Sequence, residues 1–185
     1  GAVSRHFNDV VSVMHGHGYS DGWSLTAKGM QLRNVFHEMD LLIVETLAAG
    51  LLDDLTPTHL AIMVSGFVYE QRGRDDDGDD WLPSNDVRRR TEKVLRIHRR
   101  LDEELESLGL QGMRQPDFGL ARCIALWCEG HSLRDVLDDD TFTAGDFVRS
   151  VRNLVDLMTQ IADVAENVSA RDAAREAIKL LDRGV

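Results

Sequence analysis

The side chains whose types and spacing could bind a ligand form a polar stripe along residues 145–165. At about 100° per residue, six of them collect on one side of a helix. They are Arg149, Arg152, Asn153, Asp156, Gln160 and Asp163. From Arg149 to Asp163 the stripe runs roughly 20 Å at about 1.5 Å per residue, long enough to lie along an extended chain. These side chains offer charge pairing and hydrogen bonding, so this face must meet water or a ligand.

The opposite side of the same helix is apolar at steps of three and four residues, so it needs a core to pack against. This side carries Val148, Val151, Leu154, Val155, Met158, Ile161, Ala162 and Ala165. Similar periodicity elsewhere predicts an all-α bundle of about seven or eight helices. Within it we expect the segment 116–129 at the centre, because it is apolar nearly all round. We expect 145–165 to pack against this segment and against the final helix.

The chain divides into two regions. Residues 1–30 are predicted to form an N-terminal helix followed by a small winged-helix-like hairpin, in which Tyr19, Trp23 and Leu25 lie between glycines and small polar residues. Residues 31–185 are predicted to form the helical bundle. A loop at 72–85 interrupts it, because five aspartates, glycine and proline disfavour a packed helix there.

A second charged cluster lies on 86–108, the longest helix that the pattern predicts. Its second half is acidic, and its first half carries a candidate basic patch of Arg89, Lys93, Arg96 and Arg100. A basic helix beside the acidic loop at 72–85 indicates mutual neutralisation as the simplest interpretation. Contact with RNA or with a protein partner is the alternative.

No catalytic motif accompanies these clusters. The sequence lacks a GxxxxGK[ST] phosphate loop, a DExH-type motif, GxSxG and HExxH. His15 and His17 have no third ligand at the spacing of a metal site. We therefore predict no catalytic residue and no metal site in this chain. An all-α metal-dependent hydrolase is the weakest alternative, which the metal content of the purified protein would test.

Composition narrows the function classes further. A net charge of −11 argues against a free-standing binder of nucleic-acid backbone, so any such contact must be local. Cys123 and Cys128 lie in an apolar helical pattern and are predicted to be buried, reduced thiols. No apolar run is long enough to span a membrane, and we expect a cytoplasmic protein without a membrane partner. The chain begins with Gly rather than Met, which suggests a fragment or a processed form.

Five sequence blocks, taken together, resemble a known family. They are GYSDGWSLTAKG, DLLIVETLAAGLLDDLTP, LAIMVSGFVYE, FGLARCIALWCEGHSLRDVL, and GDFVRSVRNLVDLMTQIADVA followed by AIKLLDRGV. In this order they resemble the C-terminal helical (DSHCT) domain of Ski2-like, Mtr4-type superfamily 2 DExH-box RNA helicases. The resemblance runs from about Gly18 to Val185.

The resemblance implies that the chain is one domain of an ATP-dependent RNA helicase and guides the strand leaving the motor. ATP and Mg²⁺ would then bind in RecA-like domains of the same parent, so no cofactor is expected in this chain. The implied partners are single-stranded RNA, those RecA-like domains and proteins of RNA degradation. The alternative is an α-helical protein-interaction module that recruits a nuclease or a regulator.

The family also implies roles for particular residues. Its ratchet helix faces the strand, and block order assigns that helix to 145–165. An RNA-facing pair, a basic residue and then an acidic one three positions later, falls on Asn153 and Asp156. Asn153 departs from this pattern, and Arg152 could supply the charge instead. Arg149 matches a usual arginine that contacts either RNA or a neighbouring element. The implied RNA-binding residues are Arg149, Arg152, Asn153, Asp156 and Gln160.

Overall fold

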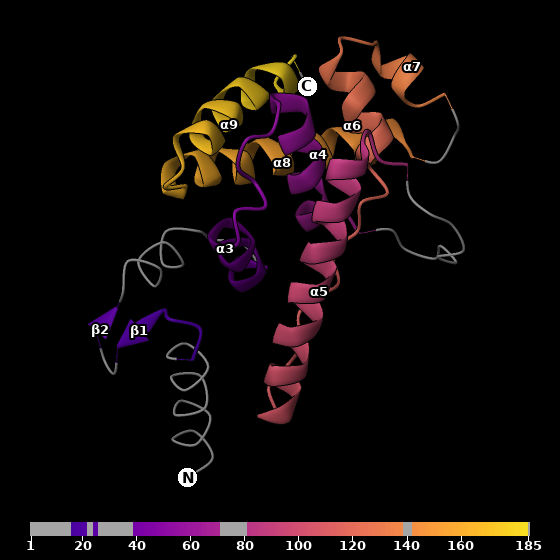
Figure 1. The fold of residues 1–185 in the computed structure, drawn as a ribbon. Coiled ribbons are helices and arrows are strands. Elements are labelled where there is room, and N and C mark those ends of the chain that lie inside the picture. Colours follow the sequence, from indigo (N-terminus) through magenta and orange to yellow (C-terminus); the bar gives the residue numbers. More distant parts are fainter. Residues whose placement is uncertain (1–15, 22–23, 26–38, 71–80, 139–141, 185) are drawn as a thin grey trace.

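The computed structural model describes residues 16–21, 24–25, 39–70, 81–138 and 142–184 (Figure 1). Its described part consists of seven α-helices and one two-stranded hairpin, which confirms the predicted all-α fold class. The elements are β1 Ser20–Asp21, β2 Ser24–Leu25, α3 Asp40–Ala48, α4 Pro57–Val68, α5 Asn85–Ser107, α6 Ala121–Cys128, α7 Leu133–Val136, α8 Ala144–Val164 and α9 Val168–Leu181.

The helices are gathered around α4. Figure 1 shows α4, α6, α8 and α9 together at one end of the molecule, with α5 extending away from them and α3 beside it. Every residue of α4 from Leu60 to Phe67 is buried, because α6, α8 and α9 all pack against this helix. The central helix is therefore α4, whereas the sequence pattern had favoured the segment 116–129 for that place.

The predicted partners of α8 are found in part. Its most extensive packing is against α9, the final helix, as expected, and α4 is a further large partner that the sequence did not indicate. With α6 it shares an edge-to-face contact of the Trp127 and Phe147 rings, whose centroids are 5.7 Å apart. The helix within the segment 116–129 begins only at Ala121.

Polar residues just before the helices fix where five of them begin. Thr56 accepts a hydrogen bond from the backbone N–H of the third residue beyond it, as an N-cap does, and Ser84, Ser132 and Thr143 do the same. The final helix begins at Val168, with Asn167 as its N-cap. Side-chain caps of this kind satisfy backbone donors that the helix itself leaves unpaired.

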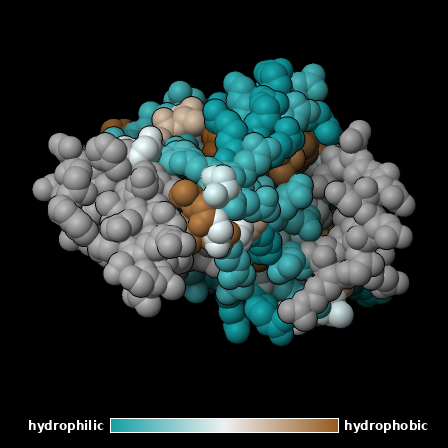
Figure 2. Space-filling view, turned by 90° about the horizontal axis from the view of Figure 1, so that it is seen from below, coloured by the Kyte–Doolittle hydropathy of each residue, from teal (hydrophilic) through white to brown (hydrophobic). Residues whose placement is uncertain are grey.

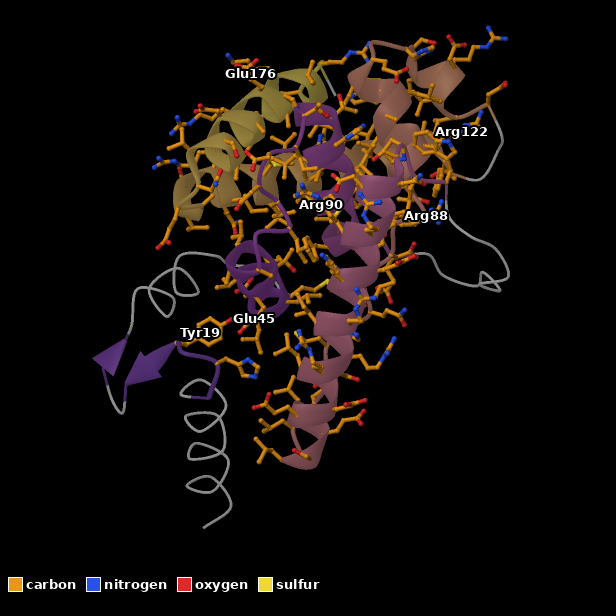
Figure 3. The ribbon with its side chains drawn as sticks, in the orientation of Figure 1. Tyr19, Glu45, Arg88, Arg90, Arg122 and Glu176 are labelled. Carbon is orange, nitrogen blue, oxygen red and sulfur yellow. The ribbon has the colours of Figure 1, made fainter. Side chains whose placement is uncertain are left out.

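A short hairpin precedes the helices. Ser20 pairs with Leu25 and Asp21 with Ser24, in antiparallel register, so a small hairpin is present where the sequence predicted one. Tyr19 is fully buried, and its hydroxyl donates to Oε1 of Glu45 on α3 at 3.1 Å (Figure 3). The predicted N-terminal helix lies outside the described residues, as does most of the acidic loop, of which residues 81–84 lead into α5.

Gly66 sits where α4 meets Phe118. A Cβ atom added to Gly66 would lie 2.3 Å from the Phe118 ring, well inside van der Waals contact. We expect Gly66→Ala to lower the free energy of unfolding by about 1–3 kcal/mol, the usual cost of overpacking a core. Urea unfolding followed by circular dichroism would measure it. Gly145→Ala is the matched control, because a Cβ at Gly145 meets no atom within 4 Å, and unchanged stability of both variants would contradict this account.

The two cysteines are free and buried, as predicted. Burial raises the pKa of the Cys128 thiol to about 12, although a hydrogen bond with Thr58 works in the opposite direction. The thiolate is the reactive form, so a thiol reagent should leave the native protein unmodified at neutral pH. After unfolding in denaturant both thiols should react. Rapid modification of the native protein would contradict the burial of these side chains.

Among the described residues, no helix is both long and apolar enough to cross a membrane.

Candidate functional site

The helix α8 displays the polar stripe that the sequence indicated. It runs over Ala144–Val164, one residue earlier at each end than the predicted 145–165. Its apolar side is buried against α9 and α4 through Val151, Leu154, Met158 and Ile161. Phe147 and Leu157 are also buried, while Val148 and Val155 are only half-buried at the edge of the stripe. Because the apolar side is fixed on two helices, the orientation of the stripe is fixed as well.

The predicted RNA-binding residues are accessible. Arg149, Arg152, Asn153 and Asp156 are exposed, and Gln160 is half-buried. Arg149 lies 3.2 Å from Asp146 on the same helix, and both side chains are more than three-fifths exposed. An exposed pair of this kind contributes little stability, so it does not prevent Arg149 from changing partner.

Arg152 and Asp156 share a hollow in the surface. The hollow holds about 200 Å³ and is also lined by Val151, Val155 and Asp182, the residue that follows α9. Within the described ranges of the chain, Arg152 takes part in no ion pair, although Asp156 lies one turn away. The hollow, which we call the α8 hollow, therefore offers a cationic donor and carboxylate acceptors side by side over an apolar floor.

The fold brings together only part of the second candidate cluster, the predicted basic patch on α5. Lys93, Arg96 and Arg100 line one hollow of about 400 Å³, together with Arg99, Ala49, Leu51 and Ile97. We call this the basic hollow. Arg89, which the sequence grouped with these cations, does not line it and lies 3.7 Å from Asp86 instead. Thus three of the four predicted cations lie together and the fourth does not.

Some basic residues serve the fold rather than a ligand. Arg90 donates from Nη1 to the backbone oxygens of Leu51 at 3.0 Å and Asp53 at 2.7 Å, and it pairs with Asp86 (Figure 3). It therefore fastens α5 to the chain that follows α3. Arg114 similarly donates to the backbone oxygens of Phe67 and Tyr69 at the end of α4.

Sequence reasoning missed two members of these sites. Asp182 reaches the α8 hollow from beyond the end of α9, so no helical period relates it to Arg152. Arg99 lines the basic hollow although it lies about 120° around the helix from Lys93 at 100° per residue. The packing of α9 on α8 brings Asp182 to the α8 hollow, and the packing of α3 beside α5 forms the basic hollow.

The described surface fits a polar ligand better than an apolar one. Figure 2, seen from below the view of Figure 1, shows that hydrophilic residues cover most of the described part of this face, with smaller apolar areas among them. Among the described residues, only Trp81 and Val168 are large apolar side chains that stand exposed. No group of three or more metal-ligating side chains occurs in the part of the chain that the structure describes.

Comparison with known proteins gives a consistent result. A family model described as "DSHCT (NUC185) domain" matches residues 22–185. Two relatives named "Probable helicase HelY", from Mycobacterium tuberculosis (strain ATCC 25618 / H37Rv) and Mycobacterium leprae (strain TN), are 30% and 31% identical to this chain. Both alignments cover the whole chain, whereas the chain spans 22% of the length of each relative.

Proposed function

The chain belongs to the DSHCT (NUC185) domain family, and from this premise we propose that it guides single-stranded RNA leaving the motor of a Ski2-like helicase. The family match agrees with the resemblance that the sequence blocks had indicated. The two relatives are named as helicases, which supports a helicase as the parent protein. In this proposal RecA-like domains of the parent bind ATP and Mg²⁺, and this chain supplies a surface for the strand.

The observation that carries the proposal is the α8 stripe with its hollow. Guiding a strand requires an exposed, rigid row of polar groups, and α8 holds its row in place through the packing of its other side on α4 and α9. The residues from Arg149 to Gln160 are spread over roughly 16 Å at about 1.5 Å per residue, which covers more than one nucleotide. A small-molecule site would instead need a deeper enclosure than a hollow of about 200 Å³.

In this proposal each side chain contacts the group of the strand that suits its chemistry. Arg152 donates to a phosphate, which any sequence offers, so it holds the strand without reading it. Asp156 accepts from a ribose 2′-hydroxyl, a group that DNA lacks, and so favours RNA. Asn153 adds an amide that donates and accepts, in place of the charge usual in the family. Such contacts are exchangeable, which suits a strand that must move.

Photo-cross-linking in the full-length parent would test the position of the strand. A photoreactive residue placed at position 153 should cross-link to single-stranded RNA when the motor is held with a non-hydrolysable ATP analogue. The same residue at position 175, which is also exposed but lies on α9, serves as the control. Equal or absent cross-linking at both positions would show that the strand does not follow α8.

A further inference from the structure

The basic hollow on α5 is a cluster of cations that neither the packing of the fold nor the α8 stripe accounts for. Four cations surround it, Lys93, Arg96, Arg99 and Arg100, and all four are exposed. The hollow opens between α5 and the chain at the end of α3, where Ala49 and Leu51 form the other wall. This is a dense group of positive charge in a chain whose net charge is −11.

These cations differ from their neighbours on the same helix. Arg89 and Arg90 both pair with Asp86, at 3.7 Å and 3.0 Å. By contrast, none of the four cations of the hollow forms an ion pair with a carboxylate among the residues that the structure describes. This holds although Glu92 and Glu103 are exposed within one helical turn of them. The positive charge of the hollow is therefore left available to an anion from outside this part of the chain.

We propose that the basic hollow binds the phosphate backbone of single-stranded nucleic acid. This inference rests on the proposed function, since it needs a parent protein that handles such a strand. Lys93, Arg96 and Arg100 follow one side of α5 over roughly 10 Å at about 1.5 Å per residue. A row of that length suits successive phosphates of a chain better than a single small anion. Arginine also offers the planar pair of donors that phosphate accepts well.

An acidic protein segment fits the hollow less well. A protein partner usually gains its affinity from an apolar or aromatic anchor that enters a pocket. Here the two large apolar side chains of the hollow are nearly covered, since Leu51 is 7% exposed and Ile97 is 8% exposed. Phosphate binding requires only the donors on the rim, and these are fully present.

The salt dependence of binding tests the proposal. The triple variant Lys93→Gln, Arg96→Gln, Arg100→Gln removes three positive charges from the full-length parent without reversing them. The affinity of this variant and of the wild-type parent for a single-stranded oligo(U) is measured over a series of salt concentrations. Each phosphate contact on a single strand contributes about 0.7 to the slope of log K against log salt, so the slope should become shallower by about 2. Oligo(dT) should show the same change, because both strands carry phosphates.

The matched control removes the same charges elsewhere. Arg134→Gln, Arg175→Gln, Lys179→Gln also replaces two arginines and one lysine, all exposed and outside both hollows, and should keep the wild-type slope. An unchanged slope in the hollow variant, or loss of binding only to an oligoglutamate peptide, would overturn the inference. Continued cross-linking of RNA at position 153 in that variant would then leave the proposed function standing. If the wild-type parent neither binds RNA nor cross-links there, the proposed function fails as well.

Discussion

Replacing Trp127 by alanine is expected to lower the free energy of unfolding of this chain by about 3–5 kcal/mol, the usual cost of truncating a buried aromatic residue. Trp127 is 4% exposed and joins three helices. From α6 its indole N–H donates to the backbone oxygen of Leu181, the last residue of α9, at 2.8 Å. Its ring also meets Phe147 of α8 edge to face. The substitution therefore creates a cavity and removes one of the two donors to the Leu181 carbonyl, the other being the backbone N–H of Arg183 at 3.0 Å.

The same tryptophan supports the end of the chain through Arg183. The guanidinium carbon of Arg183 lies 4.0 Å from the centre of the Trp127 ring, in a cation–π contact. The same guanidinium donates to the backbone oxygens of Trp127, Gly130 and His131. Trp127 belongs to the last turn of α6, and Gly130 and His131 follow its end, where a positive charge is favoured by the helix dipole. Loss of the ring should thus loosen the C-terminal residues as well as the core.

Urea unfolding followed by far-ultraviolet circular dichroism would measure the effect without relying on tryptophan fluorescence. Trp127→Phe should cost less than alanine, about 1–3 kcal/mol, because it keeps most of the ring but removes the indole donor to the Leu181 carbonyl, which keeps only the backbone N–H of Arg183. Trp81→Ala is the control, since this tryptophan is 47% exposed and should change stability by about 0.5 kcal/mol or less. Equal effects of the alanine variants at 127 and 81 would contradict the packing described here.

The α8 helix could be predicted closely because several local signals agree. Its apolar residues recur at the helical period, Thr143 caps its start, and the opposite side is polar throughout. Each signal is set by neighbours in the sequence, so no distant contact is needed to interpret it. The exposure of Arg152 and Asp156 follows from the same period.

The place of α4 could not be predicted in the same way. Its residues from Leu60 to Phe67 are almost uniformly apolar, so the pattern does not indicate which side faces a neighbour. A helix buried on all sides and one buried on a broad side look alike in sequence. The choice between α4 and the segment 116–129 as the central helix depends on which partners surround it, and this is a property of the whole fold.

The arginines of α5 show a second limit. Arg89, Arg90 and Arg96 are equivalent in type, and their spacing alone gives them similar chances of meeting a ligand. The fold separates them, because the backbone oxygens of Leu51 and Asp53 approach Arg90 from nearly forty residues away in the sequence. The start of α9 is similar. Asn167 and Ser169 are both good N-caps, and Ser169 instead accepts a hydrogen bond from the backbone N–H of Asp54.

We expect the largest effect on function from substitutions in α8. In the full-length parent, Arg152→Glu combined with Asp156→Ala should slow unwinding of a duplex with a single-stranded RNA tail by about tenfold or more. A hydrogen bond to a charged group contributes about 1.5–3 kcal/mol, and about 1.4 kcal/mol corresponds to a factor of ten. The variant removes one such contact with the phosphate and adds a repelling charge. Unwinding rates measured under saturating ATP would give the size of the effect.

ATP hydrolysis without RNA should persist in this variant, because this chain contains no nucleotide-binding motif. The matched control is Arg175→Glu combined with Asp172→Ala. These residues lie on α9, are 63% and 67% exposed, and undergo the same substitutions. Equal unwinding by the two double variants would mean that the α8 stripe only meets water.

The single variants distinguish holding the strand from recognising RNA. Arg152→Glu should weaken activity on RNA and DNA tails alike, because both carry the phosphate that Arg152 contacts in the proposed function. Asp156→Ala should mainly reduce activity on RNA, because only RNA has the 2′-hydroxyl from which Asp156 accepts in that proposal. The ratio of RNA to DNA unwinding should therefore fall in Asp156→Ala and stay nearly constant in Arg152→Glu. If the ratio changes in neither variant while both slow unwinding, Asp156 acts on the position of Arg152 rather than on the sugar.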